Sequence, residues 1–326
     1  MADTLTVQER LANAPAFSRV VDMVGAANPL QRKRVQAMLA RQGPAFFEFA
    51  ESMSRSLAAS FMRDEGDARA AAQAYDELCF EMLREQIRFR KTGVYRLDDA
   101  ADANDTVYSD PVRMRRYLIG LLLTYLFWPN HYELFKLFRR GVGALSPRRA
   151  LEIGAGHGLF TTELLRQHPS LDLTVVDISE SSIEATRTFL RAFETPAGSI
   201  DFRLADFMGP DLDLGVFDLI VMGEVVEHVN DAASLLRRAR ESLSPHGVLF
   251  LTTCANCPAA DHVYYFESAA AIRDLIEASG FAIDDEVVLP AEDVAEERWA
   301  ADRITVNYGA FLRARTPGSP GTAEGT

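Results

Sequence analysis

Two stretches of this 326-residue chain combine residue types and spacings that could do chemistry, and the first is a glycine cluster. Leu151–Phe160 reads LEIGAGHGLF, with the acid Glu152 two positions ahead of Gly154, Gly156 and Gly158. Glycine suits a backbone that must turn sharply or approach a ligand without a Cβ in the way. The helical pattern that follows offers free N–H groups at its first turn to an anionic group. The stretch therefore predicts a strand, a tight turn and a helix that either bind a ligand or pack closely together.

The second stretch is an acid and histidine cluster that follows a later apolar run. Glu224, Glu227 and His228 fall in the spacing E-x-x-E-H, and Asp261 and His262 come after the next apolar run. In an open α/β sheet, ligands bind outside the carboxyl ends of the strands, so we expect these side chains to converge. Carboxylates and imidazoles together suit a divalent metal. Oxygen ligands favour magnesium or manganese, whereas histidines admit zinc, iron or nickel.

Apolar runs and helical patterns alternate over the C-terminal half, which is typical of an α/β sheet. The expected strands are Ala150–Ile153, Leu173–Val176, Ile200–Leu204, Phe217–Met222, Val248–Thr253, Phe281–Leu289 and Ile304–Arg313. The expected helices are Leu159–Gln167, Ser179–Phe193, Asp231–Leu243 and Glu267–Ser279. We expect the last two strands to form an antiparallel pair. Asp177 ends the second strand about twenty residues past the glycines, where an acid can bind a ribose hydroxyl pair.

A glycine turn of this kind serves NAD, FAD or S-adenosylmethionine, but its glycines fall as G-x-G-x-G and not as the G-x-G-x-x-G of dinucleotide sites. With Glu152 and Asp177, the stretch resembles the first motif of class I S-adenosylmethionine-dependent methyltransferases, a resemblance that covers roughly 147–313. It implies an α/β, Rossmann-like methyltransferase sheet of seven strands with the last one antiparallel. It also implies an enzyme that uses S-adenosylmethionine.

The resemblance also implies a set of cofactor-binding residues. In the resembled family, an acid at the place of Asp206 bonds the adenine amino group, and its neighbour, here Phe207, packs on the adenine ring. The alternative is that Asp206 is an acid of a surface loop without a ligand. The helix before the first strand reaches the methionine end of the cofactor, which makes Tyr132 and Tyr125 candidates, although aromatic residues there are more often core. The full expected set is Glu152, Gly154, Gly156, Gly158, Asp177, Ile178, Asp206, Phe207, Glu224 and Tyr132.

The E-x-x-E-H pattern resembles two metal-dependent groups of methyltransferases. These are the ubiquinone-biosynthesis O-methyltransferases and the 2′-O-methyltransferases of small-RNA 3′ ends, which add a later histidine. The resemblance implies a metal set of Glu224, Glu227, His228 and His262. In the rival interpretation there is no metal: Glu224 faces the cofactor, Glu227 caps a helix, and His228 or His262 is the general base. The expected catalytic residues are accordingly His228, His262 and Glu224.

Two cysteines, Cys254 and Cys257, look like half a zinc site. No second pair exists, because the third cysteine, Cys79, is far away in the sequence. We expect Cys257 and the neighbouring aromatic residues to line the substrate pocket instead.

Residues 1–143 form an expected N-terminal helical domain that acts as a lid or in dimerisation. Leu5–Val24, Ala68–Arg90 and Pro111–Arg140 show helical patterns, the last broken near Pro129. Residues 144–315 are the expected methyltransferase domain. Residues 316–326 are rich in Gly, Pro, Ser and Thr and predict a disordered tail.

Composition limits the partners. The net charge of −13, from 34 basic and 47 acidic residues, disfavours a general nucleic-acid binder. The longest apolar run, Tyr117–Trp128, is too short for a membrane span. Three cysteines without a secretory leader predict a cytoplasmic location. We expect a homodimer.

The sequence therefore predicts an S-adenosylmethionine-dependent methyltransferase acting on a small molecule in specialised, natural-product metabolism, with a divalent metal as a candidate assistant. Three alternatives stay open. The first is a metal-dependent RNA 2′-O-methyltransferase, which the acidic charge disfavours. The second is an inactive methyltransferase-like binding or scaffold protein, which the intact glycine motif disfavours. The third is a nicotinamide dehydrogenase.

Overall fold

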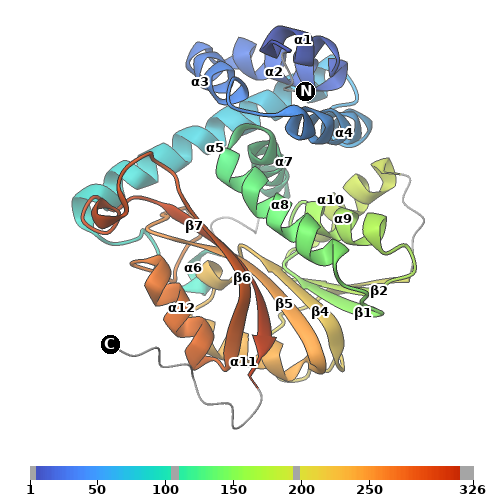
Figure 1. Ribbon diagram of the computed structural model, residues 1–326, viewed down its shortest axis with the longest axis vertical. Coiled ribbons are helices and arrows are strands. Elements are labelled where there is room, and N and C mark those ends of the chain that lie inside the picture. The colour runs from blue at the N-terminus through green and yellow to red at the C-terminus, as the bar shows by residue number, and fades with distance from the viewer. Residues whose placement is uncertain (1–4, 104–109, 194–198, 316–326) are drawn as a thin grey trace.

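The computed structural model describes residues 5–103, 110–193 and 199–315, and the expected tail at 316–326 lies outside them (Figure 1). The N-terminal helices are α1 (Val7–Ala12), α2 (Pro15–Ala27), α3 (Pro29–Leu39), α4 (Pro44–Ser60), α5 (Glu65–Thr92), α6 (Ala100–Ala103), α7 (Pro111–Phe127) and α8 (Pro129–Gly143). Several begin at a proline, which needs no N–H partner in the first turn of a helix. Pro15 divides the expected helix Leu5–Val24 in two, because its ring cannot continue the turn before it.

A seven-stranded sheet follows the helices. Its strands are β1 (Arg149–Ile153), β2 (Asp172–Asp177), β3 (Ile200–Leu204), β4 (Phe217–Gly223), β5 (Leu243–Ala255), β6 (Phe281–Pro290) and β7 (Val306–Ala314). The connecting helices are α9 (Leu159–Gln167), α10 (Glu180–Ala192), α11 (Ala232–Glu241) and α12 (Ala269–Ala278). The spatial order is β3-β2-β1-β4-β5-β7-β6, and β7 alone runs antiparallel to its neighbours. The expected fold class is confirmed.

The strand order reverses between β1 and β4, and this reversal creates the crevice. Ile153, near the end of β1, is level with Val176 of β2 and Met222 of β4. Gly223, at the end of β4, is level with Thr252 of β5. The loops that carry both chemical motifs therefore leave the sheet at one edge, at the switch point where ligands bind in doubly wound sheets.

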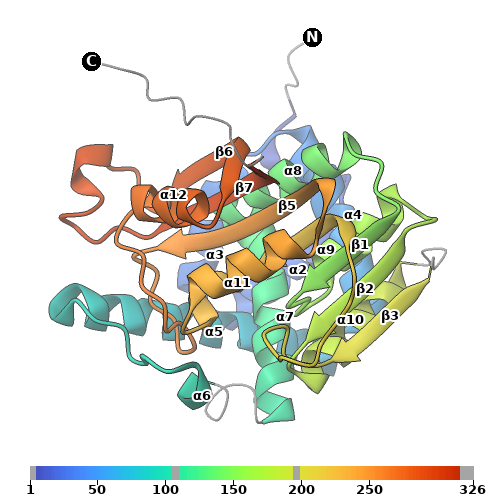
Figure 2. The same cartoon turned by 90° about the horizontal axis from the view of Figure 1, so that it is seen from below.

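The two faces of the sheet are covered by different helices. Leu219 and Val221 of β4 belong to a core shared with the N-terminal helices, whereas Ile220 and Met222 belong to a core shared with α11 and α12. This division follows from the alternation of side chains along a strand. Figure 2 shows α11 and α12 in front of the sheet and the N-terminal helices behind it. The N-terminal helices thus share one continuous core with the sheet.

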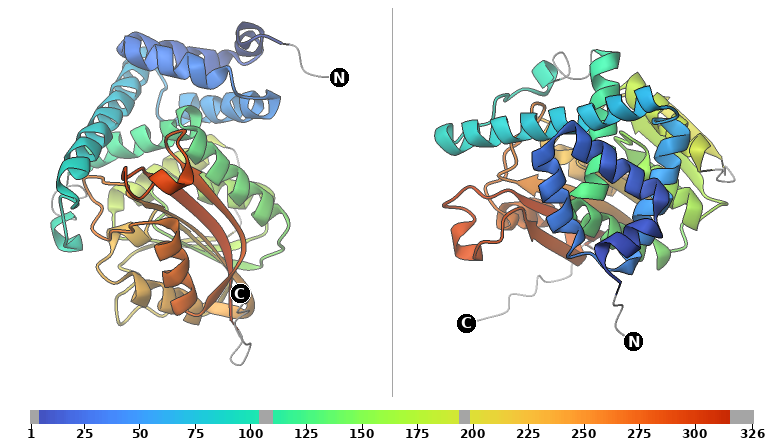
Figure 3. Two further views of the ribbon diagram at one scale, coloured as in Figure 1. Left: turned by 60° about the vertical axis from the view of Figure 1, so that its left-hand side comes forward. Right: turned by 90° about the horizontal axis from the view of Figure 1, so that it is seen from above.

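Helix α5 connects the N-terminal helices with the opposite side of the molecule (Figures 1 and 3). Gln86 on α5 donates to the carbonyl of Arg303, and Arg303 in turn donates to the carbonyls of Phe89 and Arg90. The end of α5 is therefore fixed to the β6–β7 connection. Within the described ranges, none of the helices combines the length and the apolar character that crossing a membrane requires.

Candidate cofactor and acceptor site

A cavity of about 1530 Å³ opens at the carboxyl ends of the central strands. Its wall comes from the loops after β1, β2, β3, β4 and β5 and from helices α3, α5 and α7. Pockets for one small ligand occupy roughly 300–1,000 Å³. The cavity therefore has room for a cofactor and a second ligand beside it.

The glycine turn contributes two of its three glycines to this cavity. Gly154 and Gly156 line it, and their φ angles of 71° and 53° lie in the left-handed region. Gly158, with φ of 82°, begins α9 and faces α10 instead, where an added Cβ would lie 2.8 Å from the Cα of Thr186. Gly156 thus leaves backbone open to a ligand, Gly154 also makes room for Val225, 2.7 Å from an added Cβ, and Gly158 allows two helices to pack closely.

Asp177 links the glycine turn to the end of β2. Its Oδ2 accepts the N–H of Gly156 at 3.3 Å, and its Oδ1 accepts the N–H of Ser179 at 2.8 Å. Burial raises the pKa of this carboxyl to about 6, although the backbone N–H groups favour its charged form. Ile178 beside it is 53% exposed and also lines the cavity.

Asp206 and Phe207 line the cavity after β3. Asp206 is exposed, and its Oδ1 accepts the N–H of Met208 at 2.8 Å. Phe207 is buried, with the guanidinium of Arg238 5.3 Å from its ring centre. The pair presents one carboxylate and one aromatic ring to the same part of the cavity.

Besides Gly158, two residues of the expected cofactor set lie away from the cavity wall in the described structure. Glu152 is buried in the sheet, where its Oε2 accepts the hydroxyl of Thr161 at 2.5 Å. Burial, with some effect of the nearby Asp177, raises the pKa of Glu152 to about 8. Tyr132 packs in the core, with ring centres 4.9 Å from Phe46 and 5.2 Å from Phe49. The sequence does not show which residue of α8 faces the cavity, because adjacent side chains of a helix point about 100° apart.

The residue before Tyr132 lines the cavity in its place. His131, together with His157 of the glycine turn, stands beside the ring of Tyr125, each with its ring centre 5.4 Å away. Burial lowers the pKa of His131 to about 4 and that of His157 to about 3, so both imidazoles are neutral at pH 7. Neither histidine was expected as a site residue. The position of His157 inside the glycine motif was the available signal.

The carboxylates of the second motif lie side by side, with Glu224 at the cavity wall and Glu227 buried beside it. Glu224 follows β4 with a φ of 53°, and its N–H donates to the carbonyl of Thr252 at 3.0 Å. Glu227 is 1% exposed, and its Oε2 accepts the hydroxyl of Thr253 at 2.7 Å. The Oε1 of each carboxyl is buried, and among the described residues only the neighbouring carboxyl, when one of the pair is protonated, forms a hydrogen bond with it. Burial raises the pKa of both carboxyls, and the charge of Glu224 raises that of Glu227 further.

His228 and His262 meet at the same place, with perpendicular rings whose centres lie 4.8 Å apart. The Nδ1 of His228 lies 3.1 Å from the carbonyl of Asp261, and the Nδ1 of His262 lies 2.6 Å from the carbonyl of Cys257. A carbonyl can only accept, so each neutral ring carries its proton on Nδ1 and leaves Nε2 as the acceptor. Burial lowers the pKa of His262 to about 4. Glu227, His228 and His262 offer ligand atoms within 4.8 Å of one another.

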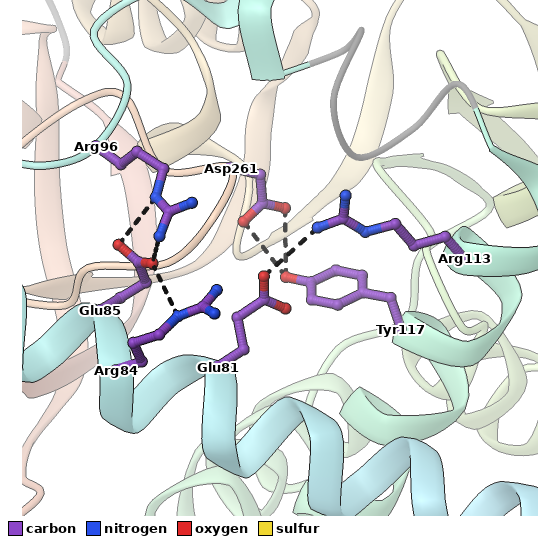
Figure 4. Close-up of polar contacts among 7 residues, drawn as sticks. All are labelled: Glu81, Arg84, Glu85, Arg96, Arg113, Tyr117 and Asp261. Carbon is purple, nitrogen blue, oxygen red and sulfur yellow. Dashed lines mark hydrogen bonds and ion pairs between the residues drawn. The ribbon is translucent and has the colours of Figure 1, made fainter.

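Tyr117 on α7 adds a residue that the sequence did not single out. Its hydroxyl lies 3.3 and 3.4 Å from the two carboxylate oxygens of Asp261, which is 1% exposed (Figure 4). Asp261 also lies 3.6 Å from the Nδ1 of His228. Nearby, Arg113 of α7 pairs with Glu81 of α5, and Arg96 pairs with Glu85 of α5. Helix α7 thus lies against the loop that carries His262, and the Arg113–Glu81 pair joins α7 to α5.

Comparison with known proteins finds a methyltransferase domain within the chain. Residues 151–249 match the family model described as a methyltransferase domain. A ubiquinone biosynthesis O-methyltransferase of Acinetobacter baylyi is 22% identical over 188 residues, which are 51% of this chain and 76% of that protein. The protein of the same name from Xanthomonas campestris pv. campestris is 30% identical over 118 residues, 36% of this chain. This match spans 47% of the Xanthomonas protein, about half its length.

Two solved structures show more distant likenesses. The N-methyltransferase NodS from Bradyrhizobium japonicum WM9, in complex with S-adenosyl-L-homocysteine, aligns with a TM-score of 0.47 and 19% identity over 67% of this chain and all of that chain. The [4+2]-cyclase SpnF aligns with a TM-score of 0.46 and 15% identity over 56% of this chain and 80% of that chain. At these values neither likeness decides the acceptor. The domain match and the curated relatives support a class I S-adenosylmethionine-dependent methyltransferase.

Proposed function

We propose that the enzyme methylates a small-molecule acceptor of specialised metabolism, and that a divalent metal held by Glu224, Glu227, His228 and His262 assists. The observation that carries this proposal is that the glycine turn and His228 and His262 line one cavity large enough for two ligands. The relatives named as ubiquinone biosynthesis O-methyltransferases support a small molecule methylated on oxygen.

In this proposal the donor half of the cavity holds S-adenosylmethionine. The Asp177 carboxylate accepts the ribose hydroxyls, and the open backbone at Gly154 and Gly156 lies against the methionine portion. Asp206 bonds the adenine amino group while Phe207 packs on the ring. Glu152 and Gly158 act indirectly, since Glu152 bonds Thr161 and Gly158 lets α9 lie against α10.

The acceptor half has apolar walls from the N-terminal helices. Met38 of α3, Met82 of α5 and Leu121 of α7 all line it. An acceptor with an apolar body fits these walls, and the helices exclude water from the sulfonium, as in enzymes with a lid. We therefore retain the division into a helical lid at 1–143 and a methyltransferase domain at 144–315 as part of the proposal.

The chemistry is an in-line attack of the acceptor on the sulfonium methyl. Much of the rate comes from orientation, because the sulfonium is already activated. A hydroxyl acceptor must also lose its proton. Without a metal, the Nε2 of His228 would take that proton, because the Asp261 carbonyl holds Nδ1. With a divalent ion bound at the second motif, the same Nε2 would be a ligand, and the ion would supply Lewis-acid chemistry that lowers the pKa of the hydroxyl.

The test combines calorimetry with a turnover assay. We expect S-adenosylmethionine to bind, and phenolic acceptors to be methylated at a rate that falls at least about tenfold with EDTA and returns on adding metal. Activity unchanged by EDTA would remove the metal from the proposal. A salt-sensitive shift of RNA, with methylation of the RNA, would favour the RNA alternative instead.

We also propose that the enzyme is a cytoplasmic homodimer that associates through α5. Its three cysteines are free thiols, in keeping with a reducing compartment. Phe80, Leu83 and Ile87 form an exposed apolar stripe on α5, and they are 65%, 55% and 49% exposed. Glu77 at one end of the stripe pairs with Arg116, and Arg90 at the other end pairs with Glu292, so the flanking charges are already balanced. Two copies of α5 related by a twofold axis would cover the apolar stripe, which therefore fits a second copy of this chain.

A further inference from the structure

Two thiols lie at the centre formed by the second motif. Cys254 of β5 and Cys257 just beyond it are 2% and 7% exposed. Cys254, Cys257 and His262 offer ligand atoms within 4.8 Å of one another. Glu227 belongs to two adjoining groups of the same size, one with His228 and His262 and one with Glu224 and Cys254. Each two of the three groups share one residue, so sulfur, nitrogen and oxygen donors adjoin one another at the ends of β4 and β5.

The turn between the two cysteines is held in place from several sides. Asn256 has a φ of 50°, in the left-handed region that a non-glycine residue rarely adopts. Its side-chain amide donates to the carbonyl of Glu267 at 3.0 Å and accepts the hydroxyl of Tyr265 at 3.0 Å. The N–H of Cys257 donates to the hydroxyl of Tyr95 at 2.9 Å. The surrounding structure therefore fixes the turn that brings Cys257 back to Cys254.

The remaining two donors are oriented and incompletely satisfied. The Nδ1 of His262 bonds the Cys257 carbonyl, which leaves Nε2 for a ligand, an arrangement found around metal-bound histidines. The Oε1 of Glu227 is buried, and its only hydrogen-bond partner among the described residues is the Glu224 carboxyl when one of the two is protonated, whereas Oε2 is bonded to Thr253. Two buried carboxyls that share one proton offer a cation a place that the proton otherwise fills.

We propose that Cys254, Cys257, His262 and the Oε1 of Glu227 bind one zinc ion. Zinc takes four ligands in a tetrahedral arrangement and accepts sulfur, nitrogen and oxygen donors. Thiolates select zinc against magnesium and manganese, which prefer oxygen. On binding, both thiols lose their protons to solvent. This inference rests on the metal centre of the proposed function but changes its donor set: Glu227 and His262 stay, and the two thiols take the places of Glu224 and His228. It does not rest on cofactor binding.

Cobalt(II) substitution tests the donor set without any turnover assay. Metal-free enzyme, kept reduced, is titrated with cobalt(II). We expect one equivalent to bind, with a sulfur-to-cobalt charge-transfer band in the near ultraviolet, and zinc to displace it. Cys254→Ser and Cys257→Ser should each weaken or remove the band. Cys79→Ser is the matched control and should keep it, because Cys79 lies on α5 outside the three ligand groups.

A variant that keeps both thiols guards against loss of folding. Glu227→Gln is close in shape and should retain the band while binding cobalt at least about tenfold more weakly. Binding without a charge-transfer band, or no stoichiometric binding, would overturn the proposal. So would a Cys254–Cys257 disulfide, detected by mass in enzyme purified with its thiols blocked. Calorimetry with S-adenosylmethionine separates the two proposals. A chain that binds S-adenosylmethionine but not cobalt keeps the proposed methyl transfer and loses the metal centre.

Discussion

Glu152 and Asp177 end neighbouring strands of the sheet, and both are buried acids with a raised pKa. Only Asp177 lines the cavity. Glu152 instead faces Thr161 of α9. Of the two acids of the first motif, one therefore has the geometry of a ligand-binding residue and the other that of a support for the helix behind the turn.

Asp177→Ala should weaken binding of S-adenosylmethionine by about 1–3 kcal/mol, because charge-assisted hydrogen bonds are lost. In the wild type, affinity should also fall as the pH drops below about 6, where Asp177 takes up a proton. Isothermal calorimetry measures both effects. Asp172→Ala is the control, since Asp172 lies at the other end of β2 and is exposed. Equal affinities for Asp177→Ala and the wild type would contradict the ribose assignment.

Glu152→Gln should change how stability depends on pH. The folded pKa of about 8 lies above the ordinary value of 4.5, so the folded protein holds a proton that the unfolded chain releases. In the wild type, this group therefore lowers the free energy of unfolding as the pH rises from about 4.5 to about 8. The glutamine variant lacks that loss, so its free energy of unfolding at pH 8 should exceed that of the wild type by on the order of 3 kcal/mol. Urea denaturation at both pH values checks this, and parallel curves for both proteins would contradict it.

At the scale of elements, the glycine turn shows how one motif serves two purposes. Gly154 and Gly156 lie at the cavity, whereas Gly158 lies where α9 and α10 meet. The second motif is similarly divided. Glu224 and His228 line the cavity, but Glu227 is turned into the molecule toward Thr253. Each loop therefore anchors itself to a neighbouring element with one part of its motif and presents the other part to the ligand.

Gly158→Ala should destabilise the fold by about 2–4 kcal/mol, because its φ is positive and the new Cβ would collide with the backbone of Thr186. Gly43→Ala is the matched control. Gly43 has a φ of −90°, and a Cβ there meets no described atom within 4 Å. Its change should stay within about 1 kcal/mol. Chemical denaturation measures both, and equal effects at the two positions would be the contrary result.

At the scale of the whole molecule, the N-terminal helices complete the core of the sheet. Phe138 of α8 packs against Phe160 of α9 and Phe250 of β5, with ring centres 4.6 and 4.9 Å away. The same helices line the acceptor half of the cavity. The helical region is thus positioned to contribute both to stability and to enclosure of the acceptor.

A fragment of residues 144–315 should therefore fail to unfold cooperatively, because removing α7 and α8 exposes the aromatic face around Phe160 and Phe250. A fragment of residues 110–315 restores these helices and should recover part of the transition. Thermal unfolding followed by circular dichroism compares the two. A cooperative, monomeric 144–315 fragment would show that the sheet folds independently of the helices.

Phe80→Asp combined with Ile87→Asp should convert a dimer into a monomer, because two charges would then lie in the apolar stripe of α5. Leu30→Asp is the control, as Leu30 is 75% exposed on α3, outside the stripe. Sedimentation velocity gives the mass of each. A monomeric wild type, or a double variant that stays dimeric, would exclude this interface.

The sequence by itself determined the order of the strands and helices from Ala150 onward, because this order depends on local periodicity and on glycines whose positive φ values few other residues tolerate. The antiparallel last strand and the methyl donor were implied by the resemblance to class I methyltransferases. Only the tertiary structure decided that His131 and not Tyr132 reaches the cavity, since neighbouring residues of a helix face different ways. It also brought Tyr117 to Asp261, and both cysteines to His262. Such contacts join residues far apart or across a turn, and their geometry comes from packing that no local pattern encodes.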